Sequence, residues 1–229
     1  MTAPSVSVVI AAHDEAATIA NVVRGAREAL GPQCAEVLVV DDGSSDGTAE
    51  AARVAGATVL RLDRNQGKGA ALRAGIPTTR GEWVVFLDAD GQDDPAEIPL
   101  LLARAADGPD VALVNGSRFL GTLRRGAISA PNLVGNLAFT GLFAALYGRR
   151  VTDSQAGFRA FRGDVVRGLP LRSTEYEIET EMLAQVIRRG FRVVEVPVTR
   201  ERRQAGTTDF KRVRNGLRIL WTIVRERVR

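Results

Sequence analysis

Two aspartates that could hold a metal ion follow a short apolar run near the middle of the chain. Asp88 and Asp90 end the segment WVVFLDAD, and Asp93 and Asp94 come shortly after them. In an extended chain, residues two apart project to the same side, so both carboxylates can face one cation. A hard ion such as Mg²⁺ or Mn²⁺ is typically held by one or two carboxylates plus substrate phosphate oxygens. An isolated Asp-x-Asp is also typical of a solvated turn, so the surrounding sequence must decide.

Other polar segments carry residues suited to binding a nucleotide. VVDDGSSDGT places Asp41 and Asp42 before a turn, where they could bind a ribose or a base, or simply lead into a capped helix. NQGKGAALRAG places Lys68 at the start of a predicted helix, where free N–H groups attract phosphate. His13 ends the first apolar run, and by itself it is interpreted as a turn residue. The spacing of a P-loop and the GxGxxG fingerprint are both absent, which argues against P-loop NTPases and Rossmann dehydrogenases.

The elements that must position these residues alternate through the first half of the chain. We predict strands at 5–12, 35–42, 58–63 and 82–90, separated by helices at 16–30, 47–57 and 69–79. The strand segments are continuously apolar, as expected for parallel strands covered by helices on both faces. The predicted fold class is α/β. Ligands of such sheets bind beyond the carboxyl ends of the strands, so the polar segments should meet in one crevice.

The second half adds a strand at 112–119, apolar and acidic helices at 130–148 and 173–190, and a strand at 191–198. The apolar helix is short for a membrane span. The C-terminal segment is amphipathic and basic, because one helical face carries Phe210, Val213, Leu217, Leu220, Trp221 and Val224. We therefore predict a domain over 1–208 and a basic amphipathic helix over 209–229, with no transmembrane segment.

The composition of the chain indicates what kind of partner and which cellular compartment to expect. The formal net charge is +4, from 31 basic and 27 acidic residues. Ten Lys or Arg residues against three acids fall in 200–229, which favours an anionic partner. The single cysteine, Cys34, cannot form an intramolecular disulfide, and the first residues lack a basic leader. We expect a cytoplasmic protein.

The ordered set of motifs resembles family 2 glycosyltransferases of the GT-A fold. The segments are VVIAAHDE, VVDDGSSDGT, NQGKGAALRAG, FLDADGQDDP, GSRF, TDSQAGFRAF, EIETEML and EVPV. Within that family they look most like the branch of dolichyl-phosphate mannose and glucose synthases. The resemblance implies inverting, metal-dependent transfer of a hexose from a GDP-mannose or UDP-glucose type donor to polyprenyl phosphate. It implies that 1–208 is a GT-A, Rossmann-like catalytic domain.

The resemblance also implies roles for individual residues. The implied metal ligands, for Mg²⁺ or Mn²⁺, are Asp88, Asp90 and Gln92. The implied donor-binding residues are Ala11, His13, Glu15, Asp41, Asp42, Lys68, Asp88, Ala89, Asp90, Gln92 and Arg203. The implied catalytic residues are Asp90, Arg118, Asp153 and Arg203, with Gln155 and Arg159 in the acceptor-side motif and Gly206 and Thr208 in the loop of Arg203.

A phosphate acceptor removes the need for a catalytic base, since its second pKa near ~6 leaves it largely dianionic at neutral pH. A lipid-linked acceptor further implies peripheral attachment to the anionic inner face of a membrane. One alternative is a soluble glycosyltransferase that uses a small phosphorylated or sugar acceptor. A second alternative is a nucleic-acid binder. It is disfavoured because the acidic crevice would repel nucleic-acid phosphates, and we expect no nucleic-acid partner.

Overall fold

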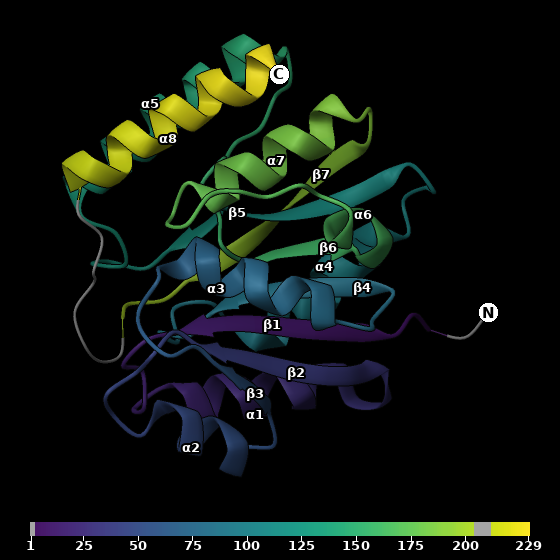
Figure 1. Cartoon of the computed structure of the whole chain (residues 1–229). Helices are drawn as coiled ribbons and strands as arrows, with labels where there is room; N and C mark the ends of the chain where they lie inside the picture. Colours follow the sequence, from purple (N-terminus) through teal and green to yellow (C-terminus); the bar gives the residue numbers. More distant parts are fainter. Residues whose placement is uncertain (1–2, 204–211) are drawn as a thin grey trace.

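The computed structural model describes residues 3–203 and 212–229 of the chain. Within these residues the strands form a mostly parallel seven-stranded sheet in the order β3-β2-β1-β4-β6-β5-β7, with β6 antiparallel to both neighbours (Figure 1). The strands are β1 Val6–Ala12, β2 Cys34–Asp41, β3 Thr58–Arg61, β4 Trp83–Asp88, β5 Val111–Leu123, β6 Arg159–Arg162 and β7 Arg192–Arg200. The helices are α1 Ile19–Leu30, α2 Thr48–Val54, α3 Lys68–Gly75, α4 Ile98–Ala105, α5 Ala130–Tyr147, α6 Gly163–Arg167, α7 Ile178–Arg188 and α8 Arg212–Val228. The predicted α/β fold is confirmed.

The sheet is covered by helices on both faces, as its continuously apolar strands require. In β1, Val8 and Ile10 pack into one buried cluster, which contains side chains of α1 and α4. Val9 packs into the opposite cluster, which contains side chains of α3 and α7. Because successive strand residues point to opposite faces, both sets must be apolar. The consequence is a rigid centre whose polar strand ends project from one edge.

The sequence analysis did not predict three elements of the structure, β6, α4 and α6. β6 consists of only four residues, Arg159–Arg162, and two of them are arginines. Arg159 is nevertheless completely buried, because its guanidinium donates to Asn115 Oδ1 at 2.8 Å, Glu179 O at 2.6 Å and Ser154 O at 2.8 Å. An arginine can be buried at this strand position because its partners come from distant parts of the sequence. Local sequence patterns therefore do not reveal the strand. The short helices α4 and α6 were also missed.

The C-terminal helix α8 packs beside α5 and α7 (Figure 1). Its buried side is formed by Asn215, Ile219, Thr222, Ile223 and Glu226. The apolar face predicted from helical spacing points outward, with Leu217 63% and Trp221 64% exposed. Phe210 and the predicted domain boundary at 208/209 lie outside the described residues.

Candidate active site

The carboxyl ends of three adjacent strands bring the acidic segments together. β1 lies between β2 and β4, and Ala11 pairs with Val40 on one side and with Asp88 on the other. The turns that follow these strands carry Glu15, Asp42 and Asp90, all buried. The crevice expected from parallel topology is therefore an acidic edge of the sheet.

Asp88 is held between two cations. Its Oδ1 accepts a hydrogen bond from Lys68 Nζ at 2.7 Å, and its Oδ2 accepts one from Arg200 at 3.0 Å. Lys68 also pairs with Glu179 of α7 at 2.6 Å. Burial alone would raise the pKa of Asp88, but Lys68 and Arg200 outweigh it and hold that pKa well below its usual value. Asp88 is therefore ionised over the whole physiological range.

Asp90 has the opposite tendency. Its Oδ2 accepts from Arg203 at 3.1 Å and lies 3.7 Å from Arg200, and its Oδ1 accepts from the backbone N–H of Gln92 at 3.0 Å. Burial, followed by the negative charge of Asp88, raises the pKa of Asp90. A further cation near both carboxylates would favour the ionised form of Asp90.

Arg203 joins Asp90 to the end of β1. Its Nη2 pairs with Glu15, whose pKa is raised by burial despite this contact. The rest of the motif to which Arg203 was assigned, Gly206 and Thr208, lies outside the described residues.

Asp42 shapes the loop that presents Lys68. It accepts hydrogen bonds from the backbone N–H groups of Gln66 and Gly67, each at 2.8 Å. Gly67 adopts a positive φ of 96°, and a Cβ there would come within 2.3 Å of Thr174 O. Only glycine fits this turn. In this structure Asp42 acts on the loop, and its contact with a donor nucleotide stays a prediction.

Other predicted donor-binding residues lie around the same edge. Asp41 is fully buried and accepts from Ser44 N at 2.9 Å. His13 lies 3.6 Å from Asp14 through Nε2, while its buried Nδ1 has no hydrogen-bond partner among the described residues. Ala11 and Ala89 contribute backbone to this edge, and the Ala89 carbonyl accepts from Thr18 at 2.8 Å. Their assigned roles remain predictions.

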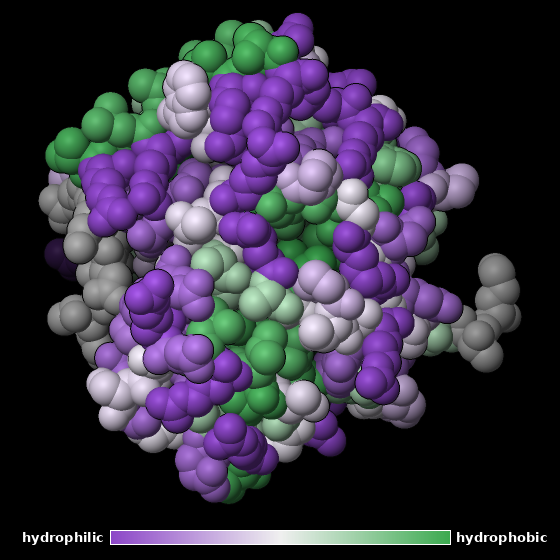
Figure 2. Space-filling view, viewed as in Figure 1, coloured by the Kyte–Doolittle hydropathy of each residue, from purple (hydrophilic) through white to green (hydrophobic). Residues whose placement is uncertain are grey.

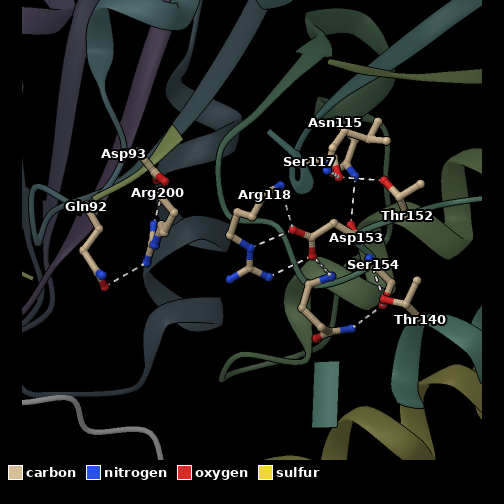
Figure 3. Close-up of polar contacts among 12 residues, drawn as sticks. Gln92, Asp93, Asn115, Ser117, Arg118, Thr140, Thr152, Asp153, Ser154 and Arg200 are labelled. Carbon is tan, nitrogen blue, oxygen red and sulfur yellow. Dashed lines mark hydrogen bonds and ion pairs between the residues drawn. The ribbon is translucent and has the colours of Figure 1, made fainter. Parts of the chain in front are cut away.

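Gln92 lies beside Asp88 and Asp90, but its side chain is hydrogen-bonded within the protein. Its amide nitrogen donates to Glu201 O at 2.7 Å and to Ala127 O at 3.1 Å. Its Oε1 accepts from Arg200 at 3.2 Å (Figure 3). These bonds tie the turn after β4 to the end of β7. Ligation of a metal by the Gln92 oxygen remains a prediction.

The predicted acceptor-side residues form a second group. Arg118, in β5, makes a bidentate pair with Asp153 through Nε at 2.7 Å and Nη2 at 2.8 Å. In the view of Figure 3, Arg118 lies between Arg200 and Asp153. Burial would raise the pKa of Asp153, yet Arg118 lowers it below the ordinary value. Asp153 is therefore a poor base and is suited to fixing Arg118 in place.

The neighbours of this pair extend the network. Gln155 donates to Thr180 Oγ1 at 2.8 Å, and Arg159 is occupied within the protein as described above. Sequence reasoning missed two members of the acidic edge, Arg200 and Glu179. Arg200 is the second residue after the EVPV segment, but no local sequence pattern indicates that its side chain reaches Asp88. The EIETEML motif contained Glu179 without indicating that it pairs with Lys68.

The described residues could hold a divalent cation through two carboxylates. No group of three or more His, Cys, Asp or Glu side chains suited to a metal ion occurs in residues 3–203 and 212–229. Asp88 and Asp90 are hard oxygen donors, and Mg²⁺ commonly takes one or two carboxylates and completes its shell with water and phosphate oxygens. The donor set thus fits an ion that binds together with a diphosphate.

Comparison with known proteins identifies the family. Residues 7–167 match the family described as Glycosyl transferase family 2. The chain belongs to that family. Glycosyltransferase AglJ of Haloferax volcanii is 34% identical over 217 residues, which are 94% of this chain and 69% of that protein. The undecaprenyl-phosphate 4-deoxy-4-formamido-L-arabinose transferase of Salmonella paratyphi A is 33% identical over 219 residues, covering 91% of this chain and 63% of that protein.

Solved structures agree with this membership. Glucosyl-3-phosphoglycerate synthase from Mycobacterium tuberculosis, in complex with Mn²⁺, UDP-glucose and phosphoglyceric acid, matches with a TM-score of 0.79 at 25% identity. The match covers 98% of this chain and 80% of that one. A structure of the same synthase with Mg²⁺ and UDP has a TM-score of 0.78 at 24% identity. This family 2 protein is therefore a glycosyltransferase with the GT-A fold.

The Arg118–Asp153 pair of this glycosyltransferase gives a stability prediction. Asp153 has no exposed side-chain surface and Arg118 only 12%. We expect Asp153→Asn to lower the free energy of unfolding by about 3–5 kcal/mol, because it leaves a buried guanidinium unpaired. Asp110→Asn, which breaks the exposed pair with Arg192, should cost less than about 1 kcal/mol. Urea unfolding measures both.

The pH dependence follows from the lowered pKa of Asp153. A carboxyl with a depressed folded-state pKa stabilises the protein above its unfolded-state pKa, near 3.8, and that stabilisation is lost as the pH falls through the folded-state value. The gap between wild type and Asp153→Asn should therefore be largest near neutral pH and shrink below pH 3.8. A gap that is equal at pH 7 and at strongly acid pH would contradict the assignment.

Proposed function

We propose that this glycosyltransferase transfers a hexose from a nucleotide sugar of the GDP-mannose or UDP-glucose type to a polyprenyl phosphate, with inversion at the anomeric carbon. The observation that carries the proposal is the acidic edge, where Asp88 and Asp90 lie among Lys68, Arg200 and Arg203. Such an arrangement suits a donor whose leaving group is a diphosphate. The 33% identity to an undecaprenyl-phosphate transferase supports the lipid acceptor.

The chain's own residues would divide the work as follows. Asp88 and Asp90 would hold Mg²⁺ or Mn²⁺, which supplies charge stabilisation for the departing nucleoside diphosphate. Lys68 keeps Asp88 ionised and in place. Arg203 is suited to binding the diphosphate, because a guanidinium presents a planar fork of donors to phosphate oxygens.

On the acceptor side, Arg118 would bind the attacking phosphate while Asp153 fixes its orientation. A phosphate monoester is already anionic at neutral pH, with a second pKa of about 6, so no side chain has to remove a proton. The residues would act by bringing two anions together and aligning the attack.

The outer face of α5 and α8 supports a membrane-bound acceptor. Val134 is 66% exposed and Leu137 50% on α5, and Val213 on α8 is 79% exposed. Together with Leu217 and Trp221 they form an apolar strip along the edge where these helices lie (Figure 2). Exposed apolar surface of this kind, close to arginines, is suited to the interface of an anionic bilayer. We propose peripheral attachment at the cytoplasmic face through this strip.

Among the described residues, the helices are too short or too polar to cross a bilayer. In the proposed attachment, the apolar strip lies in the interfacial region of the bilayer.

A second candidate function is transfer to a small phosphorylated acceptor. It is supported by the structural match to a synthase crystallised with UDP-glucose and phosphoglyceric acid. The two candidates share the donor chemistry and differ only in the acceptor. Donor consumption with 3-phosphoglycerate, unchanged by added polyprenyl phosphate, would favour this second function.

Substitution of Asp90 tests the proposed chemistry. We expect Asp90→Ala to lower sugar transfer to a short polyprenyl phosphate by roughly 100-fold or more, because charge stabilisation of the leaving group is lost. The measurement is product formation from a panel of nucleotide sugars with Mg²⁺ or Mn²⁺. Glu50→Gln, at an exposed position of α2, is the matched control and should retain activity. Full activity of Asp90→Ala with the metal chelated would refute the proposed metal site.

Flotation with liposomes tests the apolar strip. Full-length protein should float with vesicles that contain phosphatidylglycerol. Leu217→Ser combined with Trp221→Ser should weaken binding by roughly tenfold or more, since each large apolar side chain contributes about 1.5–3 kcal/mol when fully buried. Leu100→Ser on α4 removes a leucine that is 50% exposed elsewhere and should have no effect. Equal flotation of all three proteins would contradict attachment through α5 and α8.

A further inference from the structure

The guanidinium of Arg200 lies between Asp88 and Asp90, where the proposed metal ion would bind. Its Nη1 donates to Asp93 at 2.6 Å and to Asp88 at 3.0 Å, while its Nη2 lies 3.7 Å from Asp90. The side chain is only 11% exposed. One guanidinium therefore balances three carboxylates that would otherwise repel one another at this end of the sheet.

The backbone around Arg200 is fixed. Arg200 ends β7 and forms an isolated antiparallel bridge with Asp93, and its carbonyl accepts from Arg124 N at 3.1 Å. The next residue, Glu201, donates its N–H to Gln92 O at 2.8 Å. A change in the position of the guanidinium thus requires rotation of the side chain rather than movement of the strand.

The charges around Arg200 leave a deficit of positive charge. Within residues 3–203 and 212–229, the side-chain ion pairs at this edge join three cations, Lys68, Arg200 and Arg203, to five carboxylates: Glu15, Asp88, Asp90, Asp93 and Glu179. A divalent ion would correct the deficit, but at Asp88 and Asp90 it would be repelled by the adjacent guanidinium. A nucleoside diphosphate offers that guanidinium another anionic partner close by.

We infer that Arg200 is an internal counter-cation that a divalent metal must displace, so that metal alone binds weakly and metal with a nucleoside diphosphate binds tightly. Arg200 leaves Asp88 and Asp90 when the metal arrives and moves toward the diphosphate. The inference rests on the proposed function, whose metal and donor it concerns. It makes Arg200 a positioning residue that couples the two ligands.

Titration of Mn²⁺, followed by electron paramagnetic resonance, tests this role without a turnover assay. Wild-type protein should bind Mn²⁺ weakly alone and at least about tenfold more tightly with UDP or GDP, within the usual range of coupling between sites. Arg200→Met should bind Mn²⁺ alone at least about tenfold more tightly than wild type, and its coupling to the nucleotide should shrink. Arg124→Met removes an arginine that is 60% exposed and paired with Glu201, so it should behave as wild type.

Thermal unfolding provides a second readout if Arg200→Met is poorly folded. Without Arg200 the three carboxylates repel one another, so Mn²⁺ alone should raise the melting temperature of this variant more than that of wild type. Arg200→Lys, which keeps the charge, should bind Mn²⁺ alone as weakly as wild type. Equal Mn²⁺ affinity and equal thermal response of wild type and Arg200→Met would overturn the inference. That result would leave the proposed sugar transfer standing, because the transfer assay judges it separately.

Discussion

The burial of carboxylates beside cations at one edge of the sheet is the constraint on which the site depends. An isolated buried carboxylate is strongly unfavourable, so each must find a cation or be neutralised. Lys68 comes from the start of α3, Arg200 from the end of β7, and Arg203 from the segment after it. The charge balance therefore joins two distant parts of the chain, the start of α3 and the segment 200–203, to the end of β4.

The same balance relates structure to chemistry. Asp88 has its pKa lowered and Asp90 has its pKa raised, although the two carboxylates are separated by one residue. The difference arises because, of these two aspartates, Lys68 contacts only Asp88, while burial and the charge of Asp88 raise the pKa of Asp90. A site with this uneven neutralisation is ready for a cation that carries more than one charge. In the proposed reaction, such a cation would stabilise the charge of the departing nucleoside diphosphate.

Much of this arrangement was predictable from the sequence because it rests on local patterns. Continuous apolar segments that end in polar residues predicted the parallel strands. They also predicted that Asp42 and Asp88 lie at the same edge of the sheet. Arg200 was not predictable, since it is separated by 112 positions from Asp88 and no local pattern encodes the contact. The strand β6 was missed because the burial of Arg159 depends on partners from other elements. Helical spacing identified the apolar face of α8, but only packing against α5 and α7 shows that this face is exposed.

The apolar strip on α5 and α8 and the acidic edge of the sheet are suited to different interactions. In the proposed attachment the strip would place apolar side chains against a bilayer, whereas the acidic edge presents carboxylates whose charge is not fully balanced to ions. The proposed reaction would need both, since it joins a water-soluble donor to a lipid-linked acceptor.

Anomalous diffraction from crystals grown with Mn²⁺ and a nucleoside diphosphate tests the central claim most directly. We predict a manganese peak between Asp88 and Asp90, with the guanidinium of Arg200 displaced from both. A clear nucleotide density with no manganese peak there, and Arg200 still paired with Asp88, would contradict it.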